Sequence, residues 1–272
     1  MKKWVLFSCF IGLTFSKPLT AYIQSYETPI VHYLHPVEID NHESNLQSVD
    51  CIFVINLNRR PDKWARVEKL FQEQKLYVNR FPAIDGWQQL TDEAVRSLVG
   101  NYQSSLNKGE LGCLLSHVSI LKEAYARGYS TIWIMEDDVE FVDDVQLIPK
   151  FLSALFSMDP DWDVFYTDTD GTYPSLSIAF RPDDLDHYPL EYYLKREVVG
   201  KGIMRTRQRF GAYSLLLSRK GIEKMLDYFT HVYLYEPIDI DMHYIPGIRQ
   251  YSVIKDVVST DNSMKPSNTK CE

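Results

Sequence analysis

The chain has 272 residues, of which 45% are hydrophobic and 24% are charged. This is the composition of an ordinary globular protein, and the length allows one large domain or two small ones. The formal net charge of −8 argues against a nucleic-acid partner, whose phosphates need a basic surface. The four cysteines suggest no disulfide framework and have no zinc-site spacing, so Cys51 and Cys113, both in apolar segments, are predicted to be core residues.

The N-terminal segment has the pattern of a secretory signal peptide. Two lysines follow the first methionine, residues 4–15 form a mostly apolar core, and small and polar residues come next. Because this core is too short to span a bilayer comfortably, residues 1–21 are predicted to be a signal peptide or a membrane anchor. Residues 22–50 show no sustained periodicity and are predicted to be a linker or a loosely packed arm. Residues 51–272 then form the principal domain.

Apolar runs alternate with amphipathic segments from residue 51 onward. The predicted elements, in chain order, are a strand at 51–57, a helix beginning at Pro61, a short strand at 81–86 closed by an Asp-Gly turn, a helix from its cap Thr91 through Val99, a long helix at 110–127 ending at Gly128, a strand at 131–135, a helix near 146–156 and a strand at 162–166. This alternation predicts an α/β fold with a largely parallel sheet.

Three adjacent acids follow the predicted strand at 131–135, namely Glu136, Asp137 and Asp138. Ligands of open α/β sheets bind at the carboxyl ends of the strands. Adjacent carboxylates repel one another, and a divalent cation is their natural compensation. The sequence contains no Walker loop, no G-x-G-x-x-G after a strand and no G-x-S-x-G motif. If the protein binds phosphate, we therefore expect a metal ion and basic side chains to bind it.

Six motifs in one order resemble those of glycosyltransferase family 25. They are Ile-Asn-Leu-Asn-Arg-Arg-Pro-Asp at 55–62, Phe-x-Ala-x-Asp-Gly at 81–86, Gly-Glu-Leu-Gly-Cys-Leu-Leu-Ser-His at 109–117, Glu-Asp-Asp at 136–138, Gly-Ala-Tyr at 211–213 leading into Leu-Ser-Arg-Lys-Gly at 217–221, and Pro-Ile-Asp at 237–239. The resemblance covers residues 51 to about 262. That family includes bacterial lipooligosaccharide galactosyltransferases and collagen hydroxylysine galactosyltransferases.

The resemblance implies a GT-A type nucleotide-sugar fold, in which a Rossmann-like sheet carries metal-binding acids at the end of a central strand. It also implies a metal-dependent inverting hexosyltransferase with a UDP-sugar donor, UDP-galactose being the expected one. The acceptor would be a hydroxyl of a lipopolysaccharide-type surface glycan or of a glycoprotein. Mn²⁺ or Mg²⁺ would act as a Lewis acid on the diphosphate leaving group.

Metal ligands are expected first among the three acids. Asp138 is the first choice for a direct ligand, with Glu136 or Asp137 supplying a second or water-mediated contact. If the strand persists, side chains alternate, and Glu136 and Asp138 share a face with the D-x-D spacing of metal-dependent glycosyltransferases. His243 could complete the metal shell or contact the diphosphate, although a lone histidine is more often structural.

Inversion needs a base that takes the proton of the acceptor hydroxyl. Asp239 matches the Pro-x-Asp position of the family and is the preferred base or acceptor-positioning residue, with Asp241 as the alternative. Further contacts to the nucleotide are expected from residues at the ends of the first two strands, since an arginine fork suits phosphate. These residues are Asn56, Arg59, Arg60 and Asp85, together with Asp137 of the acidic cluster. Arg59 and Arg60 could instead be solvated, and Asp85 with Gly86 could simply turn the chain.

Three further features have open roles. Ser116 and His117 lie on the long helix. We expect them to pack this helix or to support the site, and not to contact the substrate directly. Residues 167–170 spell a second D-x-D and could line the acceptor side. Residues 195–209 hold six basic residues and one acid, and they form either a loop that contacts diphosphate or a phosphorylated glycan, or a solvated insertion.

Two other functions share these features. An exported, catalytically silent glycan-binding domain agrees with the N-terminal segment, and a hydrolase of nucleotide-diphosphate sugars would use the same acids. Surface-glycan enzymes of bacteria draw on cytoplasmic nucleotide sugars. A membrane-associated or exported protein is expected, held at the cytoplasmic face of the inner membrane if the chain is bacterial.

Overall fold

The computed structural model describes residues 29–40, 43–101, 104, 106–169 and 189–260. Within these ranges the strands are β1 (Cys51–Asn56), β2 (Asn79–Pro82), β3 (Thr131–Glu136), β4 (Val139–Phe141), β5 (Val164–Tyr166), β6 (Glu197–Gly200), β7 (Ile203–Thr206), β8 (Ser214–Ser218), β9 (Gln250–Val253) and β10 (Val258–Thr260). The α-helices are α1 (Pro61–Glu73), α2 (Gly86–Gln89), α3 (Asp92–Val99), α4 (Lys108–Arg127), α5 (Leu147–Met158), α6 (Leu190–Leu194), α7 (Arg219–His231) and α8 (Ile238–Asp241), and the 3₁₀ helices are η2 (Pro29–Tyr33) and η3 (Met242–Tyr244).

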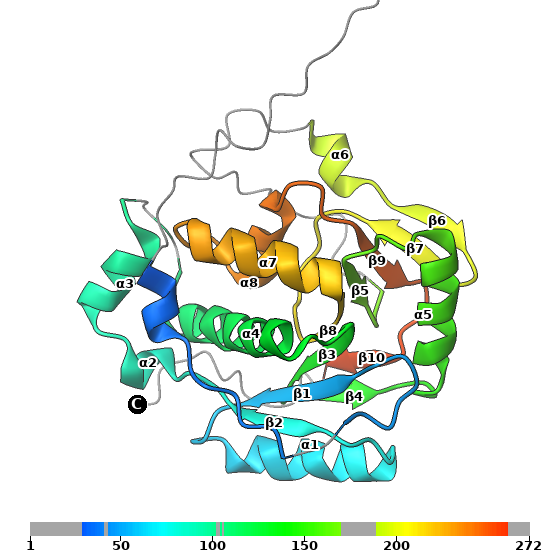
Figure 1. Cartoon of the computed structure of the whole chain (residues 1–272), viewed down its shortest axis with the longest axis horizontal. Helices are drawn as coiled ribbons and strands as arrows, with labels where there is room; N and C mark the ends of the chain where they lie inside the picture. The colour runs from blue at the N-terminus through cyan, green and yellow to red at the C-terminus, as the bar shows by residue number, and fades with distance from the viewer. Residues whose placement is uncertain (1–28, 41–42, 102–103, 105, 170–188, 261–272) are drawn as a thin grey trace, which may run out of the picture.

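Eight strands form one sheet in the order β2-β1-β3-β8-β5-β9-β7-β6, and β10 pairs with β4 (Figure 1). β1 is parallel to β2 and β3, and β5 is parallel to β9, whereas β8 runs antiparallel to both β3 and β5. The carboxyl ends of β1, β3, β5 and β9 therefore meet at one edge of the sheet, together with the amino end of β8. The predicted α/β class is confirmed. The sheet is mixed beyond β3, because β8 runs antiparallel to both of its neighbours and β7 runs antiparallel to β9 and β6.

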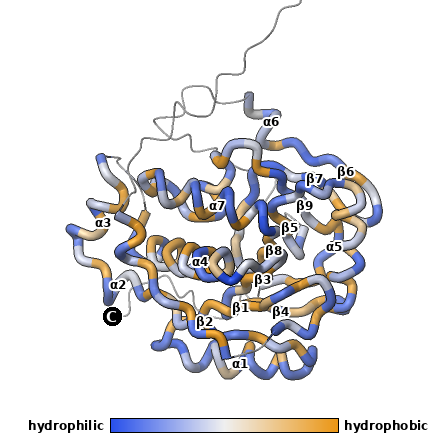
Figure 2. The backbone as a smooth tube through the Cα atoms, viewed as in Figure 1, coloured by the Kyte–Doolittle hydropathy of each residue, from blue (hydrophilic) through white to orange (hydrophobic). Residues whose placement is uncertain are grey.

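Helices cover both faces of the sheet, and β1 is buried on both sides. Cys51, Phe53 and Ile55 belong to the core under η2, α3, α4 and α7, whereas Ile52 and Val54 belong to the core under α1 and α5. Figure 2 shows the hydrophobic residues gathered in the central strands and in α4. The predicted core role of Cys51 is thus confirmed, and a strand with this double burial reads in the sequence as a continuous apolar run.

Local sequence signals set most of the element boundaries. Pro61 occupies the first turn of α1, and Thr91 caps α3 by accepting a hydrogen bond from the amide of Ala94. Asn107 and Glu110 form a capping box at the start of α4, and Gly128 ends that helix with a left-handed φ of 75°. The long helix therefore begins slightly earlier than the apolar pattern alone predicted.

The predicted strand at residues 81–86 is wrong in its second half. β2 ends at Pro82, and Asp85 is the cap of the short helix α2, where it accepts a hydrogen bond from the amide of Trp87. An Asp-Gly pair is common both in turns and at helix starts, so the pair by itself did not distinguish the two.

The described part of the N-terminal arm packs against the domain. Ile30 and Val37 join the core on the α4 side, while Leu46 and Val49 join the core on the α1 side. Scattered apolar residues are enough for this packing, although they give no periodic pattern in the sequence. The proposed signal segment, 1–21, lies outside the described residues. Among the described helices, none is both long and apolar enough to cross a membrane.

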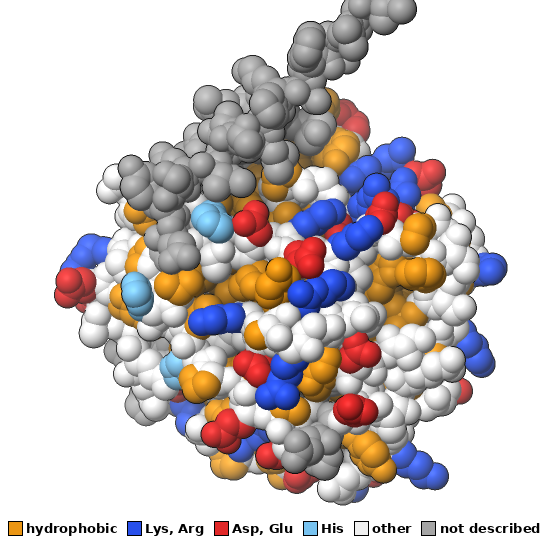
Figure 3. Space-filling view, in the orientation of Figure 1, with side chains coloured by type: hydrophobic (Ala, Val, Ile, Leu, Met, Phe, Trp, Pro, Cys, Tyr) orange, Lys and Arg blue, Asp and Glu red, His pale blue; other side chains and the backbone are white. Residues whose placement is uncertain are grey.

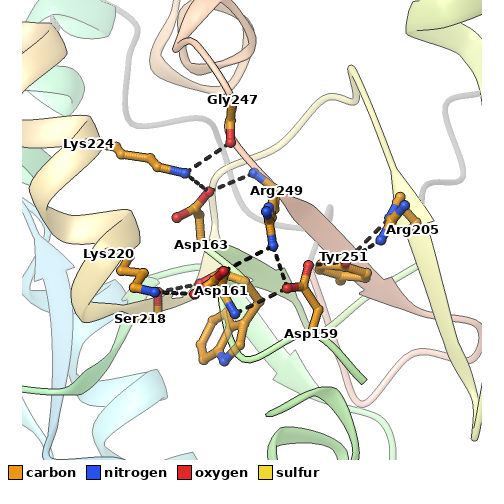
Figure 4. Close-up of polar contacts among 11 residues, drawn as sticks. Asp159, Asp161, Asp163, Arg205, Ser218, Lys220, Lys224, Gly247, Arg249 and Tyr251 are labelled. Carbon is orange, nitrogen blue, oxygen red and sulfur yellow. Dashed lines mark hydrogen bonds and ion pairs between the residues drawn. The ribbon is translucent and has the colours of Figure 1, made fainter. Parts of the chain in front are cut away.

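A network of charged residues joins the amino ends of β5 and β9, opposite the edge described above (Figure 4). The buried Asp163 carboxylate accepts hydrogen bonds from Lys224 Nζ at 2.6 Å and from the amide of Arg249 at 2.7 Å. Asp159 accepts from Tyr251 Oη and from Arg249 Nη1, both at 2.6 Å. The hydrogen bonds of these two carboxylates go to partners of the same network, which indicates a structural role, and Asp163 Oδ1 is buried without a partner among the described residues.

Two glycines allow α2 to lie directly against α4. A Cβ atom at Gly112 would overlap the carbonyl oxygen of Ile84 and lie 2.7 Å from the amide nitrogen of Gly86. A Cβ atom at Gly86 would overlap the carbonyl oxygen of Lys108. The glycines of two of the family-like motifs therefore bring the start of α2 and the start of α4 to the same edge of the sheet.

We expect Gly112→Ala to lower the free energy of unfolding by about 3 kcal/mol, because backbone atoms face the added methyl group and cannot rotate away. Gly128→Ala is the matched control, since no atom lies within 4 Å of its Cβ position. There the cost is left-handed strain alone, about 1 kcal/mol. Urea unfolding of both variants measures the difference, and equal stabilities would contradict the packing argument.

Candidate active site

A pocket of about 340 Å³ opens at the carboxyl ends of β1 and β3. Its walls come from these two strand ends, the starts of α2 and α4, the segment before β8 and the start of α8. Acids dominate its charged lining. The acidic lining residues are Asp85, Glu110, Glu136, Asp137, Asp138 and Asp239, and the basic ones are Arg59 and Lys63.

A buried ion pair forms the floor below this pocket. Lys63 Nζ lies 3.0 Å from Asp137 Oδ1, and Asn56 Nδ2 donates to Asp137 Oδ2 at 2.7 Å. Arg80 Nη2 in turn donates to Asn56 Oδ1 at 2.6 Å. Burial raises the pKa of Asp137, while Lys63 and Asn56 oppose that shift. Asp137 is thus held from beneath, and Asn56, predicted as a nucleotide contact, supports it without lining the pocket.

Asp138 carries a free carboxylate oxygen. β3 ends at Glu136, so Asp137 and Asp138 lie in a turn and the strand alternation assumed from the sequence does not extend to them. Asp138 Oδ2 lies 3.5 Å from Lys63 Nζ. Its Oδ1 is buried and has no hydrogen-bond partner among the described residues. This is the ligand atom that a cation in the pocket would satisfy.

Glu136 faces the long helix. Its Oε1 lies 3.6 Å from Cys113 Sγ and 4.0 Å from His117 Nε2. Burial, followed by the charges of Asp138 and Asp137, raises the pKa of Glu136 from 4.5 to about 8. The acids at this strand end are therefore close enough to repel one another, and Lys63 compensates mainly Asp137.

Asp239 faces the pocket from α8. Its Oδ2 accepts a hydrogen bond from the amide of Gly211 at 2.7 Å. Burial raises the pKa of Asp239, and the Gly211 amide opposes the shift. Of the two candidate bases, only Asp239 is a lining residue of the pocket.

Asp241 and His243 are not brought to the pocket. Residues two apart lie on opposite sides of a helix, and Asp241 is fully buried, with its Oδ2 accepting from the amide of Tyr235 at 3.3 Å. His243 accepts from the amide of Arg209 at Nε2 and lies 3.0 Å from Gln250 Nε2 through Nδ1. Both ring nitrogens are thus engaged, and His243 does not fit the predicted role of metal ligand.

The two neighbouring arginines have different positions. Arg59 lines the pocket and pairs with Asp85 at 2.6 Å. Arg60 pairs with the exposed Asp62 at 2.8 Å and is not a lining residue. Asp85 serves three purposes, since it also caps α2 and lines the pocket.

The second D-x-D and the basic segment have mainly structural partners where the structure describes them. Asp168 is buried against Arg209, whose Nη2 donates to it at 2.5 Å, and the guanidinium of Arg209 lies over Tyr166 at 4.0 Å. Arg207 lies over Tyr192 at 4.5 Å. Basic side chains gather near the β6–β7 end of the molecule in Figure 3. The hairpin covers residues 197–206, and no residue of 195–209 lines the pocket. Asp170 lies outside the described residues.

Sequence reasoning missed Lys63, Cys113 and Tyr213 as lining residues. In the sequence Lys63 is one of several charged residues of the helix that begins at Pro61, and only its position in the first turn, close to the end of the first strand, suggests a role in the site. Cys113 was predicted to be a core residue; its side chain is half-buried, packs against the core and faces Glu136. Ser116 has the predicted packing role, because its Oγ accepts from the amide of Ile84 at 2.9 Å.

Comparison with known proteins agrees with this architecture. Residues 49–242 match the family described as glycosyltransferase family 25 (LPS biosynthesis protein). The chain belongs to glycosyltransferase family 25. The resemblance predicted from the six motifs is confirmed, and the matched range contains every lining residue of the pocket except Thr260.

Members of family 25 with several names are similar to this chain. Human procollagen galactosyltransferase 2 is 35% identical over 128 residues, which are 43% of this chain and 20% of that protein. A Drosophila melanogaster glycosyltransferase 25 family member is 35% identical over 121 residues, 42% of this chain and 20% of its own. Human inactive glycosyltransferase 25 family member 3 is 35% identical over 127 residues, 43% of this chain and 21% of its own. The matched segment thus spans about a fifth of the length of these relatives.

Because the folded pKa of Glu136 is raised, its contribution to stability is full below pH 4.5 and is lost as the pH rises to about 8. In this window the unfolded chain ionises at Glu136 while the folded chain keeps the proton. We expect Glu136→Gln to remove a slope of up to about 1.4 kcal/mol per pH unit from the free energy of unfolding.

Urea unfolding between pH 4.5 and 8.5 (about the limits of the window), with a chelator present, measures this slope. Glu140→Gln is the matched control, since Glu140 lies on the adjacent strand β4 and its side chain is 47% exposed. An unchanged slope in Glu136→Gln would show that the carboxyl is ionised in the folded protein.

Proposed function

We propose that this chain is a metal-dependent inverting galactosyltransferase. It would transfer galactose from UDP-galactose to the hydroxyl group of an acceptor. Membership of family 25 and the name of the procollagen galactosyltransferase support the reaction class. The observation that carries the proposal for this chain is the excess of carboxylates in the pocket, with the unpartnered Asp138 Oδ1 among them.

The residues present fit Mn²⁺ or Mg²⁺, because both ions prefer oxygen ligands. Mg²⁺ is usually held by one or two carboxylates together with the phosphates of the substrate. Asp138 would hold the cation through its free oxygen, and Glu136 is the second candidate ligand. When bound, the cation supplies Lewis-acid stabilisation of the charge that develops on the diphosphate leaving group. Asp137, the remaining acid of the three, pairs with Lys63, and this ion pair holds its side chain in place.

Asp239 is the proposed base. It stands on a different element from the three acids, and the Gly211 amide fixes one of its oxygens at 2.7 Å. A carboxylate whose pKa is raised by burial is a better proton acceptor near neutral pH than a solvated one. Asp239 would take the proton of the acceptor hydroxyl as that hydroxyl attacks the anomeric carbon from the face opposite the diphosphate.

Arg59 is the proposed diphosphate contact from the protein. Arg59 lines the pocket and follows the end of β1 by three residues. The ion pair with Asp85 already orients its guanidinium. The amino end of α4, where Gly109 and Glu110 line the pocket, adds the positive end of a long helix dipole to the same region.

The acceptor is proposed to be a hydroxyl of a lipopolysaccharide-type surface glycan or of a glycoprotein. The family description names LPS biosynthesis, and one relative is named for procollagen. We also propose that residues 1–21 attach the protein to a membrane or direct its export. In a bacterial cell the protein would lie at the cytoplasmic face of the inner membrane.

A second candidate function has support from the names of relatives. Several family members that match this chain are called inactive, among them human member 3. A catalytically silent glycan-binding domain would keep the pocket without turnover. A hydrolase of the UDP-sugar would release free sugar in place of a glycan product.

We expect metal-dependent release of UDP from UDP-galactose, measured with Mn²⁺ and with a chelator. Asp138→Asn should reduce turnover by about 100-fold or more, because it removes the proposed ligand. Asp239→Asn should lower kcat by about 100-fold to 10,000-fold while leaving donor binding in place. Product analysis then separates glycan transfer from hydrolysis, and absence of both turnover and metal-dependent UDP binding would refute the transferase.

The two arginines provide a matched comparison. Arg59→Ala should raise the donor KM by about 10-fold, since a charge-assisted contact to phosphate contributes roughly 1.5 kcal/mol or more. Arg60→Ala should leave KM unchanged, because its partner is the exposed Asp62 outside the pocket. Steady-state kinetics with varied UDP-galactose decides this, and equal effects of the two substitutions would contradict the assignment of Arg59.

A further inference from the structure

A second group of ligand atoms lies beside the acids of the pocket. Cys113, His117 and Glu136, here called the thiol–imidazole cluster, each offer one ligand atom, and these atoms lie within 4.8 Å of one another. Cys113 Sγ is 3.6 Å from Glu136 Oε1, and His117 Nε2 is 4.0 Å from the same oxygen. Cys113 and His117 are one helical turn apart on α4, which places both side chains on the face that meets the end of β3.

The imidazole of His117 is oriented for a ligand at Nε2. Its Nδ1 lies 3.0 Å from the carbonyl oxygen of Cys113, so the proton sits on Nδ1 and donates to that carbonyl. The side chain of His117 is only 1% exposed, so its Nε2 atom is buried. In the described part of the chain, no group meets this atom in hydrogen-bond geometry. Burial lowers the pKa of His117, and the backbone of Cys113 and of Ala212 opposes that shift. Metal-binding histidines have this arrangement, in which a backbone carbonyl fixes the tautomer.

The ligand types identify the class of cation. A thiolate, a neutral imidazole and a carboxylate form a set that zinc and similar borderline-soft cations prefer, whereas Mg²⁺ and Mn²⁺ prefer oxygen alone. Cys113 and Glu136 both line the pocket, so a fourth coordination position would open toward it. Three protein ligands with one open position are typical of reactive zinc sites and not of closed structural ones.

We propose that Cys113, His117 and Glu136 bind a thiophilic divalent cation of the zinc class. The cation replaces the protons of the thiol and the carboxyl, which pass to solvent, and its double charge balances the two anionic ligands. The site does not depend on the proposed transferase activity, because no nucleotide sugar takes part. Glu136 belongs to both this site and the proposed Mn²⁺ or Mg²⁺ site, so the two kinds of cation compete for it.

Titration of the metal-free full-length chain with Co²⁺ tests the proposal. Cobalt reports a bound thiolate through a charge-transfer absorption in the near ultraviolet, which Mn²⁺ and oxygen ligands do not produce. We expect this band in the wild type and its disappearance when Zn²⁺ displaces the cobalt. Absence of the band in the wild type would overturn the proposal.

Two variants assign the thiol and imidazole ligands, and a third is the control. Cys113→Ser should abolish the band, and His117→Gln should weaken Zn²⁺ binding by more than about 10-fold, the loss seen even for outer partners of metal sites. Cys51→Ser is the matched control, since Cys51 is a buried thiol at the end of β1 away from the acids, and it should retain the band. A band that persists in Cys113→Ser would overturn the assignment by locating the thiolate elsewhere. Circular dichroism confirms that each variant is folded.

Discussion

The pocket depends on one buried ion pair, between Lys63 and Asp137. Three consecutive acids emerge from a central strand, and at least one of them must be neutralised before the strand end can be buried. Lys63 does this from the first turn of α1, and Asn56 and Arg80 extend the support to β1 and β2. The two neighbouring acids are left with less compensation. The pair therefore fixes the strand end and concentrates the remaining negative charge in the pocket.

Charge and packing act together at this edge of the sheet. The close contact of α2 with α4 through Gly86 and Gly112 brings Asp85 and the α4 amino end to the pocket, while α4 also carries Cys113 and His117 toward Glu136. One helix thus offers a positive dipole at its start and, farther along, the thiol of Cys113 and the imidazole of His117. Under the two proposals, the same wall would hold a cation through oxygen ligands and a second cation through sulfur and nitrogen, and Glu136 would belong to both sites.

Strand ends and helix caps could be predicted from sequence because their signals are local. Pro61, Thr91 and Gly128 act through neighbouring residues, and Glu136 to Asp138 follow an obvious apolar run. The exclusion of Asp241 and His243 could not be predicted, because it depends on the burial of Asp241 against the Tyr235 amide and on the contact of His243, in η3, with the Arg209 backbone. Lys63 was equally hidden, since its burial results from a partner 74 positions away in the sequence. Long-range pairing of polar groups leaves no periodic trace.

The antiparallel strand β8 has a consequence for folding. It enters the sheet between β3 and β5 and brings Gly211 and Tyr213 to the pocket, and its Ser214 bonds to Trp133, 81 positions earlier. Pairings over such separations close late and slowly, because the intervening chain must first lose its freedom. The acids of β3 thus acquire their opposite wall, including Asp239, only when this insertion is complete. A nascent chain released before β8 is made would display the acidic strand end without Asp239, the proposed base, opposite it.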